Sequence, residues 1–354
     1  AGVSGFVAAG ARRLTAGRLV AVVGAAAAIA AVLGALAPLI GVSADRAGWH
    51  LELLGADALT PGTPAHAILW IRLPRVAAAL VVGAALAGAG GALQALLRNP
   101  LAEPFTLGIS SGASLAAVLA IRLGVEGALG MAGVGGAALV GAAGALAIVW
   151  RLARVGDQLP PATLVLAGVT FSMFCASASV LIQYTSDFAE VSHMLAWMMG
   201  GMETVRLAEV GYAAPVIGVG LVGLLAQARA LNALAAGPEV AASLGVAVGR
   251  TQAVIFAISS LLVGAAIALV GPIGFVGLIV PHALRARIGA DHRVLLPAAM
   301  LVGAAVLAAC DTLARTVVPL HHLPTGAVTA VLGVPLFVAI LVRHKRSAAL
   351  WGRG

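Results

Sequence analysis

Long apolar segments, separated by short clusters of arginine, proline and polar residues, fill almost the whole sequence. The clearest lies between Arg75 and Arg98, where 22 consecutive residues carry no charge. A helix of that length, at about 1.5 Å per residue, crosses a hydrocarbon layer of about 30 Å. Because a helix start leaves N–H groups unbonded anyway, Pro74 is expected to begin this helix, and Asn99 and Pro100 to end it.

The same pattern predicts ten membrane-spanning helices, near residues 19–40, 74–96, 105–121, 131–150, 163–183, 207–227, 251–270, 272–288, 294–313 and 326–342. Gly271 and Pro272 interrupt the continuous apolar run that contains the seventh and eighth spans, and we expect the eighth to be short or broken. The chain then divides into an N-terminal segment at 1–18, a single transmembrane domain at 19–343 and a C-terminal tail at 344–354. The predicted fold class is an all-α membrane protein.

Composition agrees with this class. The chain is 61% hydrophobic and 10% charged, with a mean hydropathy of +1.07, which excludes an ordinary soluble domain. The segments lack the alternation of barrel strands, so their backbone hydrogen bonds must close within helices. The 45 glycines suit close helix packing in lipid.

The net charge of +8 does not indicate nucleic-acid binding, because the basic residues stand in small groups at the ends of the segments. With both termini in the cytoplasm, fifteen of the 21 Lys and Arg residues fall inside and six outside. We therefore expect a multi-pass protein with cytoplasmic termini. As an alternative, the segment 19–40, which contains Ala35, Leu36 and Ala37, is a cleaved signal peptide.

An internal similarity links two of the segments. Residues 81–90 match residues 262–271, and the same offset carries Pro100 onto Pro281. Since the two copies fall on the second and seventh spans, they run in opposite directions, as in inverted-repeat transporters. The alternative is chance similarity between Gly- and Ala-rich helices.

Enzymatic motifs are missing from the sequence. A phosphate-binding loop needs a lysine followed by Ser or Thr, whereas the single lysine, Lys345, precedes Arg346. The pattern around Ser110 matches G-x-S-x-G, but within an apolar segment it indicates helix packing rather than a nucleophile. We expect no enzyme activity, no metal site and no bound cofactor, so that a separate ATPase subunit would use any ATP and Mg²⁺.

Charged residues near the outer ends of spans have two interpretations each. Asp311 and Arg315, four residues apart, are either a local ion pair, which we favour, or part of a proton relay. Arg72, Arg75 and Arg315 are lipid-headgroup anchors or a positive collar that docks an acidic partner.

The longest inside loop, 227–250, is expected to hold a short helix outside the bilayer. Pro238 and Glu239 suit its start and Gly245 its end. The helix is either a surface connector or the docking element for a cytoplasmic partner.

Seven blocks between about residues 70 and 340 resemble the permeases of FecCD-type ABC importers. They are RLPR…GAALAGAGGALQ…RNPLAEPFTLGISSGA, LVLAGVT, WMMGG, LGVAVGRTQ, GPIGFVGLIVPHALR, DHRVLLP and CDTLAR…LPTGAV. The resemblance implies a type II ABC importer permease fold with ten helices in the bacterial inner membrane. It also implies a homodimer, two cytoplasmic ATPase subunits and a periplasmic substrate-binding protein.

The resemblance also implies roles for individual residues. It assigns binding-protein docking to Arg72, Arg75 and Arg315, the cytoplasmic gate to Asn99, Leu101, Pro161 and Ala162, and ATPase coupling to Pro238, Glu239, Ser243, Leu244 and Gly245. Relatives often carry Glu-Leu-Pro where this chain has His322, Leu323 and Pro324.

The family carries ferric siderophores, haem or cobalamin. We favour haem, because His321 and His322 would face the side where haem arrives and imidazole binds iron. A ferric siderophore or cobalamin is the alternative within the family. From a different class, the chain could be a secondary transporter without an ATPase.

Overall fold

The computed structural model describes residues 15–45, 48–156, 158–318 and 323–351, which are helical almost throughout. The main helices are α2 (Ala16–Leu36), α3 (Pro64–Leu96), α4 (Ile109–Arg122), α5 (Val125–Ala153), α6 (Pro161–Tyr184), α7 (Phe188–Met198), α8 (Leu207–Ala226), α9 (Ala228–Ala236), α10 (Pro238–Ser243), α11 (Val248–Val270), α12 (Val276–Ile288), α13 (His292–Thr316) and α14 (Thr325–Trp351). The short elements are η1 (Ala37–Leu39), β1 (Ile40–Asp45), β2 (Gly48–Leu53), η2 (Ala56–Leu59) and η3 (Pro104–Leu107).

Within the described ranges, seven helices are long and apolar enough to cross a membrane: α2, α3, α5, α6, α8, α11 and α13. Helix α4 and the apolar part of α14 are shorter, and α12 has 13 residues and starts only after the irregular segment 271–275. The expected break in the eighth segment is thus confirmed. The mostly helical membrane fold is confirmed as well, whereas the number of ten crossings stays a prediction.

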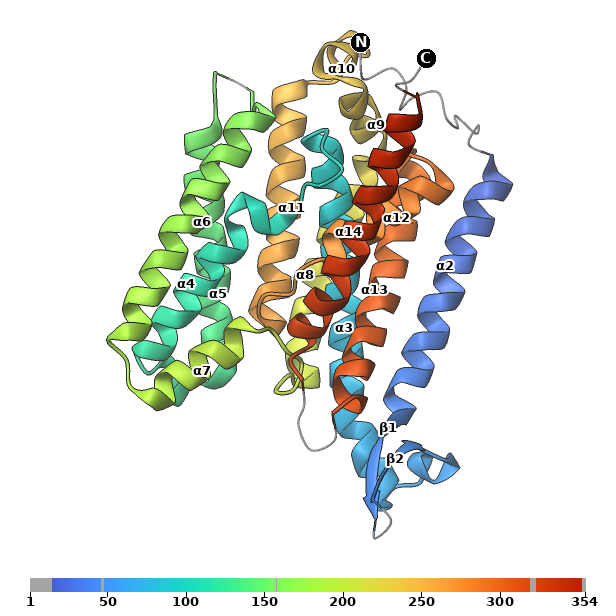
Figure 1. Cartoon of the computed structure of the whole chain (residues 1–354), viewed down its shortest axis with the longest axis vertical. Helices are drawn as coiled ribbons and strands as arrows, with labels where there is room; N and C mark the ends of the chain where they lie inside the picture. The colour runs from blue at the N-terminus through green and yellow to red at the C-terminus, as the bar shows by residue number, and fades with distance from the viewer. Residues whose placement is uncertain (1–14, 46–47, 157, 319–322, 352–354) are drawn as a thin grey trace.

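The helices form one bundle with two distinct ends (Figure 1). Helix α10 marks one, the α10 end, and the antiparallel β1–β2 hairpin marks the other, the hairpin end. Helix α2 starts and α14 finishes at the α10 end (Figure 1), as an even number of crossings requires. Helix α14 continues to Trp351, through most of the expected C-terminal tail.

Helices α3 and α11 run in opposite directions (Figure 1), as expected for the two similar segments. The two matched prolines do not occupy equivalent positions in the structure, because Pro100 lies in the turn after α3 while Pro281 lies inside α12. The two copies are similar as helices but are followed by different breaks.

Helix α3 forms the centre of the bundle, packed against α8, α11, α12 and α13. From Ala78 to Leu96 most of its side chains are buried, and apart from Gln94 this stretch is apolar on every face, as a fully enclosed helix is. Glycines allow the close approach: the backbone of Gly83 touches that of Gly303 on α13, and Gly90 touches Gly277 on α12. Small residues at these crossings let the backbones approach, as is usual in membrane bundles.

Helix α3 begins ten residues before the expected start at Pro74. The side chain of Thr63 accepts from His66 N, and Pro64 occupies the first turn. Leu69 packs in a small apolar cluster with Leu54 and Ala58, which follow the hairpin in the chain. The burial of Leu69 explains why α3 starts before Arg72 and Arg75, the basic residues that suggested a later start.

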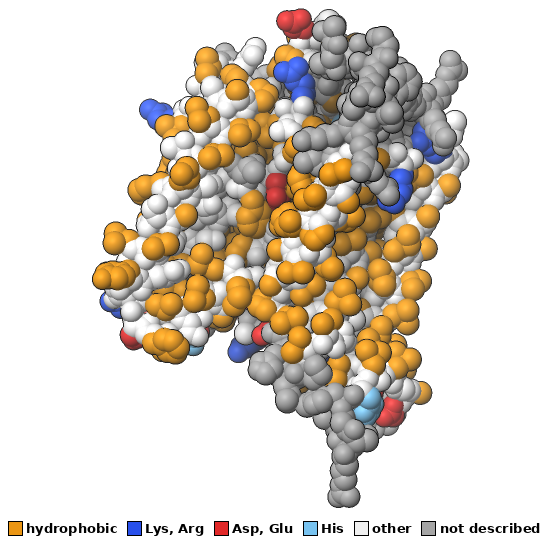
Figure 2. Space-filling view, viewed as in Figure 1, with side chains coloured by type: hydrophobic (Ala, Val, Ile, Leu, Met, Phe, Trp, Pro, Cys, Tyr) orange, Lys and Arg blue, Asp and Glu red, His pale blue; other side chains and the backbone are white. Residues whose placement is uncertain are grey.

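Hydrophobic side chains cover the flank of the bundle, and most of the visible charged side chains lie toward its two ends (Figure 2). The exposed apolar residues include many on α6 and α8, such as Phe174 and Val219. A broad apolar flank between charged ends is the surface expected of a protein in lipid.

Candidate functional site

Two stretches of irregular backbone interrupt the bundle: residues 97–108 between α3 and α4, and residues 271–275 between α11 and α12. Phe275 has a φ of 69°, a left-handed conformation that few residues other than Gly adopt. Its backbone N–H donates to Glu103 Oε1 at 2.6 Å. The carboxylate of Glu103 thus caps α12 and joins the two interruptions.

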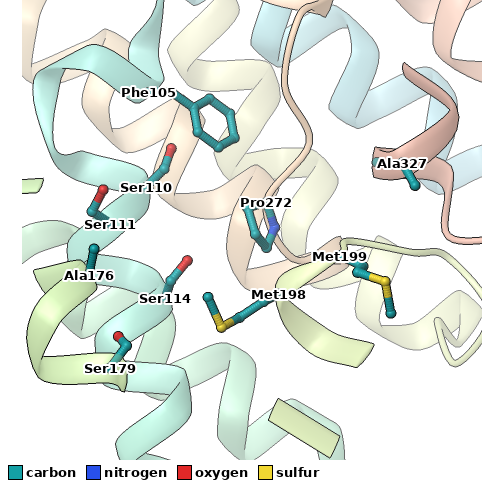
Figure 3. A pocket seen from close by; sticks show the side chains of 11 residues that line it. Phe105, Ser110, Ser111, Ser114, Ala176, Ser179, Met198, Met199, Pro272 and Ala327 are labelled. Carbon is teal, nitrogen blue, oxygen red and sulfur yellow. The ribbon is translucent and has the colours of Figure 1, made fainter. Parts of the chain in front are cut away.

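A cavity of about 380 Å³ lies beside these interruptions (Figure 3). Its lining residues are Phe105, Ser110, Ser111, Ser114, Ala176, Ser179, Met198, Met199, Pro272, Gly326 and Ala327. Ser110, Ser111 and Ser114 of α4 lie on one side, and Met199 and Ala327 on the other (Figure 3). Irregular backbone at membrane depth is tolerated where it lines a cavity, and this arrangement fits that rule.

The serine hydroxyls give this apolar cavity its polar character. Ser179 Oγ donates to Cys175 O at 2.9 Å, whereas Ser110 Oγ is buried without a hydrogen-bond partner among the described residues. The G-x-S-x-G stretch lies in helix α4, where a Cβ on Gly112 would strike Ala145 of α5. Close packing of α4 against α5 therefore explains Gly112 of this motif. Ser110 lines the cavity, which gives its hydroxyl a role other than that of a nucleophile.

The expected gate residues lie at helix termini near the α10 end. Asn99 Oδ1 accepts from Leu101 N at 2.9 Å just after α3, and the side chain of Leu101 is exposed. Pro161 and Ala162 form the first turn of α6. Both pairs belong to segments that supply other residues to the cavity wall, Phe105 after α3 and Ala176 on α6, and their role as a gate stays a prediction.

The helix expected within the loop 227–250 is α10, which starts at Pro238 as predicted. Gly245, with a φ of 80°, ends it: Gly245 N donates to Ala242 O and Val246 N to Ala241 O. Glu239, Ser243 and Leu244 are exposed. The helix therefore presents a short face that includes an apolar tip, Leu244, at the α10 end.

A second helix in this loop, α9, was not expected. Asn232 Nδ2 donates to Asp291 Oδ1 at 2.8 Å, and His292 N donates to Asn232 Oδ1 at 2.9 Å. These bonds fix α9 to the start of α13. Hydrogen bonds from Arg293 hold the pKa of Asp291 well below its usual range, against a smaller effect of burial. Helix α10 thus follows directly after α9, a helix that is hydrogen-bonded to the start of α13.

A buried ion cluster lies toward the hairpin end, which we call the Asp311 cluster: Arg75, Asp311, Arg315 and Thr325. Asp311 Oδ1 accepts from Arg75 Nη2 at 3.0 Å and from Thr325 Oγ1 at 3.1 Å, and Asp311 Oδ2 accepts from Arg315 Nε at 3.1 Å. The side chain of Asp311 is fully buried. The expected pair of Asp311 with Arg315 is confirmed, and Arg75 and Thr325 are unexpected partners.

The arginines assigned to docking differ in accessibility. Arg75 and Arg315 are only 6% and 7% exposed, and Arg315 also donates to Ala37 O and Ile40 O at the base of the hairpin. Arg72 is half-buried, with Nη1 3.4 Å from Pro38 O. Arg72 is therefore the most accessible of the three, and the docking role of all three stays a prediction.

His321 and His322 lie outside the described residues. Among the residues that are described, the structure holds no group of three His, Cys, Asp or Glu side chains that could bind a metal ion.

Sequence reasoning missed Glu103, Thr325 and the cavity serines as functional candidates. The signal was present for the serines, because Ser110, Ser111 and Ser114 fall on neighbouring turns of an otherwise apolar segment, and polar residues inside spans often mark a pathway. Thr325 gave no such signal, since its partner Asp311 lies on another helix.

Interrupted helices beside a mostly apolar cavity that also carries serine hydroxyls, within a membrane bundle, are typical of transport proteins. The sequence model of the FecCD transport family matches residues 50–343, and the chain belongs to this family. It is the permease subunit of an ABC importer rather than an enzyme.

Individual relatives agree with this membership. The cobalamin import system permease BtuC of Halobacterium salinarum is 42% identical over 79% of this chain and 74% of its own length. The hemin transport system permease HmuU of Yersinia pestis is 41% identical over 79% of this chain and 84% of its own length.

A solved structure, described as an inward-facing conformation of a metal-chelate type ABC transporter, is also similar to this chain. It superposes with a TM-score of 0.78 at 28% identity and covers 92% of this chain and 99% of that one. Membership of the family implies ATPase and substrate-binding partners.

Proposed function

We propose that this chain is half of a homodimeric permease that moves an iron chelate, haem first, from the periplasm to the cytoplasm. The observation that carries the proposal is the cavity of about 380 Å³ between the two interrupted crossings. It lies beside Pro272 at one interruption and Phe105 at the other, so movement of either changes its shape. A binding site at broken helices is the common plan of transporters.

The similarity of the relatives supports a bulky metal chelate but does not favour one chelate. The cobalamin and hemin relatives are 42% and 41% identical to this chain. Haem comes first because the sequence carries two consecutive histidines, His321 and His322, and imidazole binds iron. Cobalamin and a ferric siderophore are the alternatives.

In the proposed cycle, ATP-driven movement of the ATPase subunits acts on α10 through its exposed face. Asn232 fixes α9 to the start of α13. A displacement of α10 would therefore move α9 and α13 together instead of being absorbed by a flexible loop. Asn99 and Leu101 with Pro161 and Ala162 would open or close the path on this side. Arg72, with Arg75 and Arg315, would receive the acidic surface of a binding protein at the hairpin end.

The test is uptake by proteoliposomes that hold the permease, its ATPase and its binding protein. Haem, cobalamin and a ferric siderophore are offered separately, with ATP or a non-hydrolysable analogue. ATP-dependent haem uptake supports the proposal in full; uptake of only a siderophore or cobalamin rejects haem.

A control contains the permease without the ATPase. The proposed ABC mechanism requires that these vesicles accumulate no substrate, whereas uphill uptake by the permease alone would establish the secondary-transporter alternative.

A further inference from the structure

The Asp311 cluster connects the hairpin end to the cavity. Asp311 holds Arg75 of α3 and Arg315 of α13 while it accepts a hydrogen bond from Thr325, the first residue of α14. Thr325 is fully buried. The next two residues, Gly326 and Ala327, line the cavity. A single carboxylate therefore fixes both the arginines and the start of a cavity helix.

The start of α14 fits tightly against the rest of the cavity wall. Gly326 N donates to Gly200 O at 3.0 Å, and a Cβ on Gly326 would strike the carbonyl oxygens of Met199 and Pro272. Met199 and Pro272 line the cavity too. A shift of Thr325 therefore moves Gly326 against two other lining residues rather than into free space.

The cluster has one positive charge more than negative charge, because two guanidinium groups face one carboxylate. Arg75 Nε is buried without a hydrogen-bond partner in the described part of the chain. An excess charge at a buried site is costly. One further carboxylate, supplied by an acidic partner, would neutralise the excess positive charge and accept a hydrogen bond from Arg75 Nε.

We propose that Asp311 is a positioning residue that stands in for the partner's carboxylate and couples docking to the cavity. In the undocked state it holds Arg75 and Arg315. When a carboxylate of the partner binds these arginines, the contacts of Asp311 rearrange, and Thr325 moves with it, so the start of α14 shifts at the cavity. This inference rests on the proposed docking of an acidic binding protein at the arginines.

The test separates docking from coupling in the assembled transporter in nanodiscs. One measurement is the affinity for the loaded binding protein, and the other is the ratio of ATPase rates with and without it. Thr325→Val removes the hydroxyl that reaches Asp311 while keeping the side-chain shape. We expect unchanged affinity but a stimulation ratio lowered by about fivefold or more, in the range of ordinary coupling energies.

Two further variants control for structural damage. Thr325→Ser keeps the hydroxyl and should restore the stimulation ratio. Thr329→Val alters a buried threonine one turn along α14 that donates only to Gly326 O, within its own helix, and should behave as the unmodified protein. A Thr325→Val transporter with an unchanged stimulation ratio, or an equal loss in Thr329→Val, overturns the inference.

Asp311→Asn tests the competition between Asp311 and the partner directly. Without the internal carboxylate, the arginines should bind the partner about tenfold more tightly even though stimulation falls. A merely structural role predicts weaker capture, which would overturn the proposal. If Asp311→Asn does not assemble, the Thr325→Val and Thr325→Ser variants alone decide whether the coupling exists.

An unmodified transporter that captures no binding protein overturns the proposed docking itself, whereas normal capture with unaltered stimulation in Thr325→Val overturns only the coupling.

Discussion

Gly83 of α3 and Gly303 of α13 touch backbone to backbone, so that a Cβ on either would strike the carbonyl oxygen of the other. Helix α13 makes the most extensive contact with the central helix α3. Since a backbone cannot rotate away as a side chain can, this crossing leaves no room for an added methyl group.

Gly303→Ala is therefore expected to destabilise the bundle by about 1–3 kcal/mol, the usual cost of overpacking a core. Denaturation of the purified protein by heat in mild detergent measures the loss. The matched control is Gly144→Ala on α5, where an added Cβ meets nothing within 4 Å. A methyl group there should be neutral or slightly stabilising. Equal stability of the two variants would contradict the assigned contact.

Arg72→Glu is expected to weaken capture of the binding protein by about tenfold, because it replaces an attraction with a repulsion at the most accessible docking arginine. The measurement is binding to nanodiscs at low salt, and the effect should shrink at high salt. Arg206→Glu makes the same change of charge at an exposed residue before α8. If both variants lose capture equally, the effect is one of overall charge and Arg72 has no special role.

Leu244→Asp is expected to reduce co-purification of the ATPase by about tenfold, because it puts a charge on the apolar tip of α10. Leu123→Asp is the control, since Leu123 and Leu244 are both 69% exposed but Leu123 follows α4 at the other end of the bundle. Full retention of the ATPase by Leu244→Asp would contradict a coupling role for α10.

The hydrogen bonds to Asp291 predict a pH effect on stability. Because they depress its pKa in the folded protein, Asp291 stabilises the fold above its ordinary pKa of about 3.9 and loses that contribution as the pH falls below it. Asp291→Asn keeps an oxygen that can cap α13 but does not titrate. The difference in melting temperature between the two proteins should therefore narrow between about pH 5 and pH 3. A difference that does not vary with pH would contradict this assignment.

The sequence alone predicted the features that depend on local composition. Uncharged segments long enough to cross lipid indicated the helical membrane fold, and Pro238 with Gly245 indicated α10, because each signal lies within the element itself. The break after Gly271 was predicted for the same reason. The pair of Asp311 with Arg315 followed from their spacing of one helical turn.

Only the tertiary structure decided the features that join distant segments. Pro74 lies inside α3 because Leu69 packs against Leu54 and Ala58, a contact that no local pattern indicated. Glu103 reaches Phe275 across 172 positions and Arg75 reaches Asp311 across 236. Partners that far apart become neighbours only after the helices pack, so periodicity and spacing could not indicate the contacts of Asp311 with Arg75 and Thr325 or the assembly of the cavity wall from separate helices.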